Sequence, residues 1–193
     1  MRTLALTLAL LTLLLGCESS TAADVAAGKS LADGCAGCHG ADGVSQTPLT
    51  PSLAAQSDEF VQWQLVYFRS TARKSEVMGP ISEGLSNEDI RNLGAYYASL
   101  LPPKPSVAAD ELTATGERLA LQHRCKSCHS DDYNGFRAAA RLSGQREDVL
   151  LKALHDYKTG ARVGSGVASM SDVTFELSDD DMRALAHYMA SRP

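Results

Sequence analysis

Apolar residues recur every three to four positions in several segments of the chain, as they do on one face of an α-helix. Residues 58–71 show this spacing at Phe60, Trp63 or Gln64, Tyr67 and Phe68. Residues 145–159 show it at Leu150, Leu154 and Tyr157. No segment alternates polar and apolar residues as a half-buried strand does. The pattern therefore predicts an all-α fold.

Two more helices are predicted to begin at serine N-caps. Ser86 and Ser178 are each followed three positions later by an aspartate, the spacing of a capping box. In that motif each side chain bonds the backbone N–H of the other residue. The apolar stripes of the two helices are Ile90, Leu93, Tyr97 and Leu100 after Ser86, and Met182, Leu185 and Met189 after Ser178.

Residues 1–16 have the pattern of a cleaved export signal. Arg2 precedes an apolar run that is too short to span a membrane comfortably and is typical of a signal peptide. The run ends in Leu14-Leu15-Gly16-Cys17, which resembles the cleavage box of bacterial lipoproteins. We therefore expect a lipid-anchored protein on the periplasmic side of a bacterial membrane, with Cys17 lipidated and residues 17–23 as a tether. The alternative is an ordinary signal peptide with an incidental cysteine.

Short motifs recur about ninety residues apart, which indicates an internal repeat. The repeated motifs are Cys35-Ala36-Gly37-Cys38-His39 with Cys125-Lys126-Ser127-Cys128-His129, Leu53-Ala54-Ala55-Gln56 with Leu142-Ser143-Gly144-Gln145, and Leu85-Ser86-Asn87-Glu88-Asp89 with Leu177-Ser178-Asp179-Asp180-Asp181. Between the copies, the proline-rich residues 102–109 cannot continue a helix and favour a stiff linker. The sequence predicts two copies of one domain, at residues 24–101 and 110–193.

The charge balance narrows the range of partners. The chain has 18 basic and 23 acidic side chains and a net charge of −5. Removal of residues 1–16, which include Arg2 and no acidic residue, leaves 17 basic and 23 acidic side chains and a charge of −6. An acidic chain without a basic cluster is not expected to bind nucleic acid.

The repeated Cys-x-x-Cys-His motif is typical of covalent c-type haem attachment. Two thiols at this spacing can add to the two vinyl groups at one edge of a porphyrin, and the next residue, histidine, then reaches the iron. We therefore predict two covalently attached c-type haems. The predicted attachment residues are Cys35, Cys38, Cys125 and Cys128, and the predicted proximal iron ligands are His39 and His129.

Other uses of the cysteines fit less well. Zinc ribbons bring their Cys-x-x-Cys pairs much closer together in sequence than these two pairs lie. A thioredoxin-like redox motif requires a βαβ context, which the pattern lacks. Disulfides suit an exported protein, but they leave the histidine after each pair without an explanation.

Methionine is the ligand expected on the other side of each iron, because with histidine it closes the coordination sphere and raises the reduction potential. Apart from Met1, the first copy has one methionine, Met78, and no histidine besides His39. In the second copy we prefer Met170, which lies in a Gly/Ser-rich segment expected to form a loop. Its rivals are Met182 and Met189, which lie on an apolar helix stripe, and His123, His155 and His187.

Together these residues resemble the dihaem cytochrome c4 family, from about Asp24 to the end of the chain. Besides the haem motifs, the resemblance rests on Asp42-Gly43, Ala72-Arg73-Lys74-Ser75, Met78, Pro80, Leu85-Ser86 and Tyr96-Tyr97, and on Gln145, Tyr157-Lys158-Thr159-Gly160-Ala161-Arg162 and Met170. It implies two class I cytochrome c domains, with His39 and Met78 on one iron and His129 and Met170 on the other. It also implies that Gly28 and Gly116 lie where the first helix of each domain crosses the last, against Tyr96 or Tyr97 and Tyr188.

The chain departs from the family pattern in two places. Pro51, which packs near the proximal histidine in relatives, is expected to be replaced by Arg141 in the second copy. The lipoprotein cleavage box at Cys17 is not a general feature of the family and implies a membrane-tethered variant.

Three functions are open to a chain with these features. The first is electron transfer between a respiratory or oxidative donor and an acceptor such as a membrane-bound terminal oxidase, without bond chemistry. The second is the role of dihaem subunit in a flavoprotein sulfide dehydrogenase. The third is a dihaem enzyme, a peroxidase or thiosulfate dehydrogenase, which requires an open iron or a cysteine ligand. Because all five cysteines already have an expected role, the sequence favours an electron carrier over an enzyme.

Overall fold

The computed structural model describes residues 22–162 and 168–193, and these residues form ten helices and no strand. The first half of the fold contains α1 (Val25–Ala32), α2 (Ala36–His39), α3 (Asp58–Arg69), α4 (Met78–Glu83) and α5 (Asn87–Ser99). The second half contains α6 (Glu111–Gln122), α7 (Lys126–His129), α8 (Glu147–Lys158), α9 (Ala168–Phe175) and α10 (Asp179–Ala190). The export signal, Cys17 and most of the tether lie outside the described residues. Within the described ranges, no helix has the length and apolarity needed to cross a membrane.

Side-chain caps fix the start of the longer helices in the same way in both halves. Ser86 and Ser178 form the predicted capping boxes with Asp89 and Asp181, so α5 and α10 begin where the sequence indicated. Asp24 caps α1 by accepting from two backbone N–H groups, and Asp110 caps α6 with a capping box of its own. Local sequence thus determines where the first and last helix of each half begin.

The first and last helices of each half cross at a glycine. A Cβ built on Gly28 in α1 would lie 2.1 Å from the carbonyl oxygen of Asn92 and 2.8 Å from Cβ of Tyr96 in α5. A Cβ built on Gly116 in α6 would lie 2.1 Å from the carbonyl oxygen of Ala184 and 2.5 Å from Cβ of Tyr188 in α10. Only glycine allows this approach, so the crossings implied by the family resemblance are confirmed.

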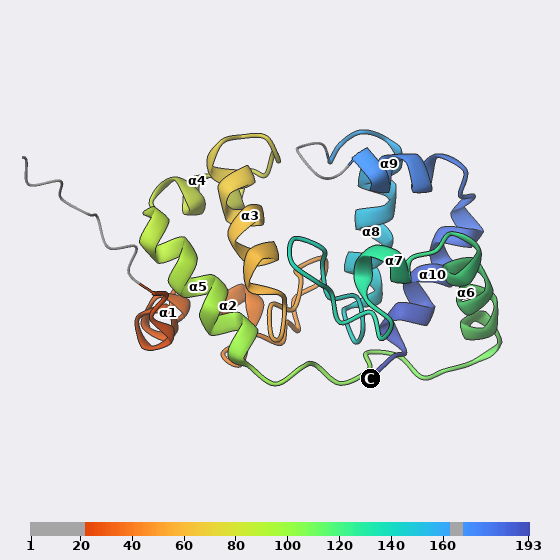
Figure 1. Ribbon diagram of the computed structural model, residues 1–193, viewed down its shortest axis with the longest axis horizontal. Helices are drawn as coiled ribbons and strands as arrows, with labels where there is room; N and C mark the ends of the chain where they lie inside the picture. The colour runs from red at the N-terminus through yellow and green to blue at the C-terminus, as the bar shows by residue number, and fades with distance from the viewer. Residues whose placement is uncertain (1–21, 163–167) are drawn as a thin grey trace, which may run out of the picture.

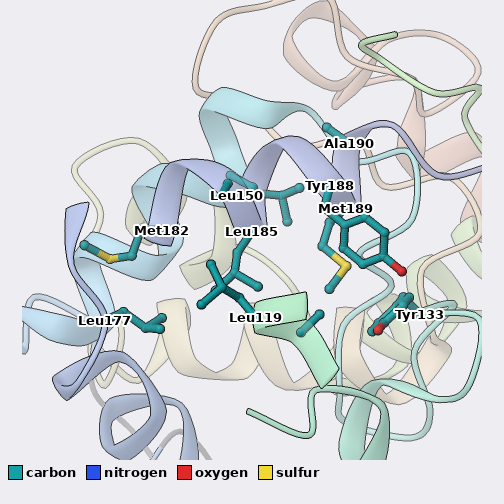
Figure 2. Packing of buried hydrophobic residues seen from close by; sticks show 12 residues of the cluster. Leu119, Tyr133, Leu150, Leu177, Met182, Leu185, Tyr188, Met189 and Ala190 are labelled. Carbon is teal, nitrogen blue, oxygen red and sulfur yellow. The ribbon is translucent and has the colours of Figure 1, made fainter. Parts of the chain in front are cut away.

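Each half has its own apolar core, built on its last helix. In the second half, Met182, Leu185, Tyr188 and Met189 of α10 are buried against α6 and α8, as Figure 2 shows. The ring of Tyr188 meets the fully buried ring of Tyr133 edge to face, with 5.8 Å between ring centroids. In the first half, Ile90, Leu93 and Tyr97 of α5 are buried, and Leu100 packs against them. The predicted stripes on α5 and α10 are confirmed.

The buried face of α3 differs from the sequence prediction. The helix buries Val61, Leu65 and Phe68 and packs on α4 and α5, whereas Trp63 is 46% exposed and stacks on Tyr67. The prediction included Phe68, which is buried, but it also included Trp63 and missed Val61 and Leu65, because aromatic residues on both sides of the helix gave two overlapping 3.6-residue patterns. The boundary prediction for α3 was long by two residues, because the chain leaves the helix at Ser70.

The two halves lie side by side and are joined by an extended linker (Figure 1). Between them, the Gln56 side chain bonds the backbone N–H and C=O of Arg141, each at 2.9 Å. The Gln145 side chain bonds the N–H and C=O of Ser52 in the same way, again at 2.9 Å. Further bonds across the interface join Leu49 to Asp148, Ser57 to Arg137, Arg146 to Ser45, and Arg162 to Gln64. The four glutamine bonds are buried and related by a pseudo-twofold, and the other bonds lie at more exposed positions around them.

Candidate haem-binding sites

The four predicted attachment cysteines are free thiols on or beside the two shortest helices, α2 and α7. Cys35 and Cys125 are half-buried and pack against the apolar cores, while Cys38 and Cys128 are exposed. Burial raises the pKa of Cys35 and of Cys125, so both keep their protons at neutral pH. Each pair thus offers one thiol at the edge of the core and one toward solvent.

The two predicted proximal histidines have the same hydrogen bond. Nδ1 of His39 lies 2.8 Å from the carbonyl oxygen of Pro51, and Nδ1 of His129 lies 2.8 Å from the carbonyl oxygen of Ala140. A carbonyl only accepts, so Nδ1 carries the proton in both rings and Nε2 keeps its lone pair. Burial lowers the pKa of both histidines, which favours the neutral ring. The neutral ring with its proton on Nδ1 is the tautomer that a histidine needs to bind a metal through Nε2.

The expectation that Arg141 replaces Pro51 was wrong. Ala140 supplies the carbonyl that Pro51 supplies in the first half, and Arg141 corresponds to the next residue, Ser52. The hydrogen bond uses a backbone carbonyl, which any residue provides, so the loss of proline leaves the proximal contact unchanged. The guanidinium of Arg141 turns elsewhere and donates to the side chain of Asn134 and the carbonyl of Ser143.

The two candidate methionines occupy equivalent short helices. Met78 is the first residue of α4, where its N–H donates to Ser75 Oγ at 3.0 Å, and its side chain packs on the first core. Met170 lies inside α9 rather than in the loop that the Gly/Ser-rich sequence suggested. The Thr174 hydroxyl donates to the Met170 carbonyl at 2.9 Å, one turn back, which supports helix at this point. Both methionines are partly buried.

The rival residues in the second half have other structural roles. His187 is buried, with Nδ1 3.1 Å from a carboxylate oxygen of Glu147 and Nε2 3.1 Å from one of Asp110. His155 lies 3.8 Å from Asp179 on the surface, and His123 caps the end of α6. Met182 and Met189 are 0% and 4% exposed inside the core of the second half. These contacts leave Met170 as the best placed candidate.

Arg73, which is half-buried, and Arg162, which is buried, meet between the halves, and in the sequence they were recognised only as part of the family resemblance. Arg73 stacks on Phe68 and Arg162 stacks on Tyr157, with 4.6 and 4.7 Å to the ring centroids. Both donate to one acceptor, Gln64 Oε1, at 2.6 and 2.7 Å. Burial and the neighbouring Arg162 lower the pKa of Arg73 to about 9. The repeat of Tyr-or-Phe, then arginine five residues later, was the signal that could have identified this pair.

The residues present fit a covalently bound haem in each half. Each half supplies two free thiols, a histidine with Nε2 available and a partly buried methionine. Nε of Arg162 is buried without a partner, which suits the acidic side groups of a haem. Among the described residues, no group of three or more His, Cys, Asp or Glu side chains could hold a metal ion by itself.

Comparisons with known proteins agree with this arrangement. The family model "Cytochrome c" matches residues 25–100 and again residues 113–193. Cytochrome c4 from Azotobacter vinelandii is 34% identical, over 96% of this chain and 97% of its own. The thiosulfate dehydrogenase electron acceptor from Thiomonas intermedia is 31% identical, over 87% of this chain and 82% of its own. The crystal structure of reduced cytochrome c4 from Pseudomonas stutzeri superposes with a TM-score of 0.82 at 28% identity, over 89% of this chain and all of that one.

The family model covers both halves, and the relatives match nearly the whole chain, so the fold and the cofactor content follow together. The sequence prediction of two cytochrome c domains is confirmed, as is the prediction of two c-type haems. The chain belongs to the cytochrome c family, as a dihaem protein of the cytochrome c4 type with two covalently bound haems.

Proposed function

We propose that this protein carries electrons between a donor and an acceptor protein on the periplasmic side of a bacterial membrane. The observation that supports this most directly is the duplicated proximal contact, in which the same 2.8 Å bond from Nδ1 prepares the Nε2 atom of His39 and of His129. A haem iron with a histidine and a methionine ligand gains and loses one electron without bond chemistry. Two such centres make a carrier rather than an enzyme.

In this proposal each half holds one haem with its own residues. In the first half, Cys35 and Cys38 bond the haem, and His39 and Met78 bind its iron. In the second half, Cys125 and Cys128 bond the haem, and His129 and Met170 bind its iron. Arg73 and Arg162 are suited to the acidic side groups of the haems, because burial strengthens the attraction between opposite charges.

Voltammetry of the holoprotein on an electrode tests this function. We expect two reversible one-electron waves that do not change when hydrogen peroxide or thiosulfate is added. A catalytic current with either compound would overturn the carrier proposal in favour of a dihaem enzyme. The Met170→Ala variant is the matched comparison, because it is expected to open the iron of the second half.

A thiosulfate-oxidising enzyme is one candidate for the electron donor. It is favoured by the likeness to the Thiomonas intermedia protein, which is named as an electron acceptor of thiosulfate dehydrogenase. The expected result is reduction of the oxidised holoprotein by thiosulfate dehydrogenase plus thiosulfate, and no reduction by thiosulfate alone. If thiosulfate dehydrogenase fails to reduce the holoprotein while a flavoprotein sulfide dehydrogenase succeeds, the donor is a sulfide-oxidising enzyme instead.

We also propose that Cys17 anchors the protein to the membrane through acyl chains. The support is the sequence Leu14-Leu15-Gly16-Cys17 at the end of an apolar run. Mass spectrometry of the mature protein is expected to find a lipid on an N-terminal Cys17. In cell fractionation, the Cys17→Ser variant is expected to move from the membrane fraction to the soluble fraction. An unmodified mature N-terminus at another residue would contradict the anchor and leave the carrier function intact.

A further inference from the structure

One peptide unit in the first half contacts both the proximal histidine and the other half of the protein. The carbonyl of Pro51 accepts from His39 Nδ1 at 2.8 Å. The N–H of the same peptide unit belongs to Ser52 and donates to Gln145 Oε1, across the interface, at 2.9 Å. The bonds to the two ends of this peptide therefore connect His39 to a glutamine of the second half.

The second half repeats the arrangement in the opposite direction. The carbonyl of Ala140 accepts from His129 Nδ1 at 2.8 Å. The N–H of Arg141, in the same peptide unit, donates to Gln56 Oε1 of the first half at 2.9 Å. Gln56 and Gln145 hold equivalent positions in the repeat, so each half sends one glutamine to the proximal peptide of its partner.

Both glutamine side chains are buried and hydrogen-bonded across the interface. Gln56 is 4% exposed and Gln145 is 5% exposed, and the backbone residues that they contact, Ser52 and Arg141, are 2% and 6% exposed. Each side chain makes a second bond, from Nε2 to the carbonyl of the residue whose N–H it accepts. These bonds fix the orientation of each amide, and low exposure strengthens them; Gln145 Oε1 accepts a further bond from the Arg146 N–H at 3.0 Å.

We propose that Gln56 and Gln145 are positioning residues that tune the haem of the opposite half. This inference rests on His39 and His129 being the proximal ligands. When the N–H of a peptide donates a hydrogen bond, electron density within that peptide shifts toward its own carbonyl oxygen. The carbonyl oxygen then accepts more strongly from the histidine Nδ1–H. A stronger bond at Nδ1 makes the ring a more basic ligand, which favours the oxidised iron and lowers its reduction potential. Gln56 therefore acts on the haem of His129, and Gln145 on the haem of His39.

Because each glutamine is predicted to act on the haem of the opposite half, its substitution should give a result that a purely structural role would not give. In Gln56→Met, which keeps the length of the side chain and removes its polar atoms, the potential of the haem on His129 should rise. In the reduced protein, the NMR signal of the His129 Nδ1–H should move upfield and exchange faster with solvent. The haem on His39 should keep its potential. Gln145→Met should give the mirror result, with the change confined to the haem on His39.

Ser57→Ala is the matched control, because Ser57 bonds Arg137 across the same interface and contacts neither proximal peptide. It should change neither potential. The proposal is overturned if Gln56→Met alters the haem of its own half, if Ser57→Ala produces the same shift, or if neither potential moves. If the histidine NMR signals that the iron shifts in the wild-type holoprotein come from histidines other than His39 and His129, the ligand assignment is refuted instead. The two failures are thereby distinguished.

Discussion

Leu49 and Asp148 lie in different halves of the protein, and the backbone N–H of Leu49 donates to Asp148 Oδ2 at 2.9 Å. The same carboxylate accepts from the Arg146 guanidinium at 2.9 Å, while Arg146 also donates to the Ser45 carbonyl in the first half at 3.3 Å. Asp148 thus ties an ion pair of the second half to the backbone of the first. The contact makes the attachment of the halves sensitive to the charge of one carboxylate.

Acid is expected to loosen this attachment. The Arg146 bond and the Leu49 N–H lower the pKa of Asp148 below its usual value of 3.8. A carboxylate whose pKa is lower in the folded state stabilises that state above pH 3.8 and loses this contribution as pH falls through the folded pKa. Small-angle scattering of the holoprotein should therefore show a looser attachment of the halves in Asp148→Asn than in the wild type at neutral pH. The difference should disappear below the folded pKa of Asp148, where both proteins lack the charge. Identical curves for the two proteins would remove Asp148 from the interface account.

The helix crossing at Gly28 predicts a cost for a single methyl group. Gly28→Ala gains about 1 kcal/mol in helix propensity, but its Cβ would lie 2.1 Å from the Asn92 carbonyl oxygen. Overpacking at such a contact costs about 1–3 kcal/mol, so we expect a net loss of stability. Denaturant unfolding of the holoprotein measures it. Gly84→Ala, whose Cβ would meet its nearest neighbour at 3.8 Å, is the control and should not destabilise the protein.

His187 is expected to matter for stability and not for the haems. In His187→Leu the carboxylates of Glu147 and Asp110 lose the ring that lies 3.1 Å from each. The variant loses the hydrogen bond from the ring to Glu147, and one such bond contributes about 0.5–1.5 kcal/mol net, which thermal melting should detect. The absorption spectrum should stay that of the wild type. His155→Leu, at an exposed position 3.8 Å from Asp179, should change neither property. A spectral change in His187→Leu would make His187 an iron ligand in place of Met170.

Removing each candidate methionine is expected to open one iron at a time. Met78→Ala should let the first haem bind carbon monoxide and should lower its potential, because histidine and methionine together favour the reduced iron. Met170→Ala should do the same in the second half. Met189→Leu replaces a methionine that is 4% exposed in the core and should leave both haems closed. Carbon monoxide titrations of the three reduced variants give the comparison, and an unchanged response in Met78→Ala or Met170→Ala would exclude that residue as a ligand.

Local signals in the sequence were enough to predict much of the structure. The capping boxes at Ser86 and Ser178 depend on residues three positions apart, so they could be recognised without any tertiary information. The haem motif likewise places its thiols and histidine within one short segment. The crossings at Gly28 and Gly116 came from the family resemblance rather than from the residues alone, since a glycine in a helix has no unique meaning.

Features that depend on how segments dock were less accessible. The face of α3 was misjudged at Trp63, because two overlapping apolar patterns differ only in which one the core selects. Met170 was expected in a loop, because the glycines and serines around it are typical of loops, whereas it lies in α9. The interface through Gln56 and Gln145 was missed, because buried amides follow no periodicity. Their recurrence at equivalent positions in the two copies was the one sequence signal that pointed to them.

The central claim is that each half closes its iron with protein ligands on both sides, so that the protein carries electrons and binds no small ligand. The absorption spectrum of the reduced holoprotein, with and without carbon monoxide, tests it most directly. We predict two c-type haems per chain and a spectrum that carbon monoxide does not change. A haem that readily binds carbon monoxide would show that Met78 or Met170 is not a ligand, and it would contradict the account.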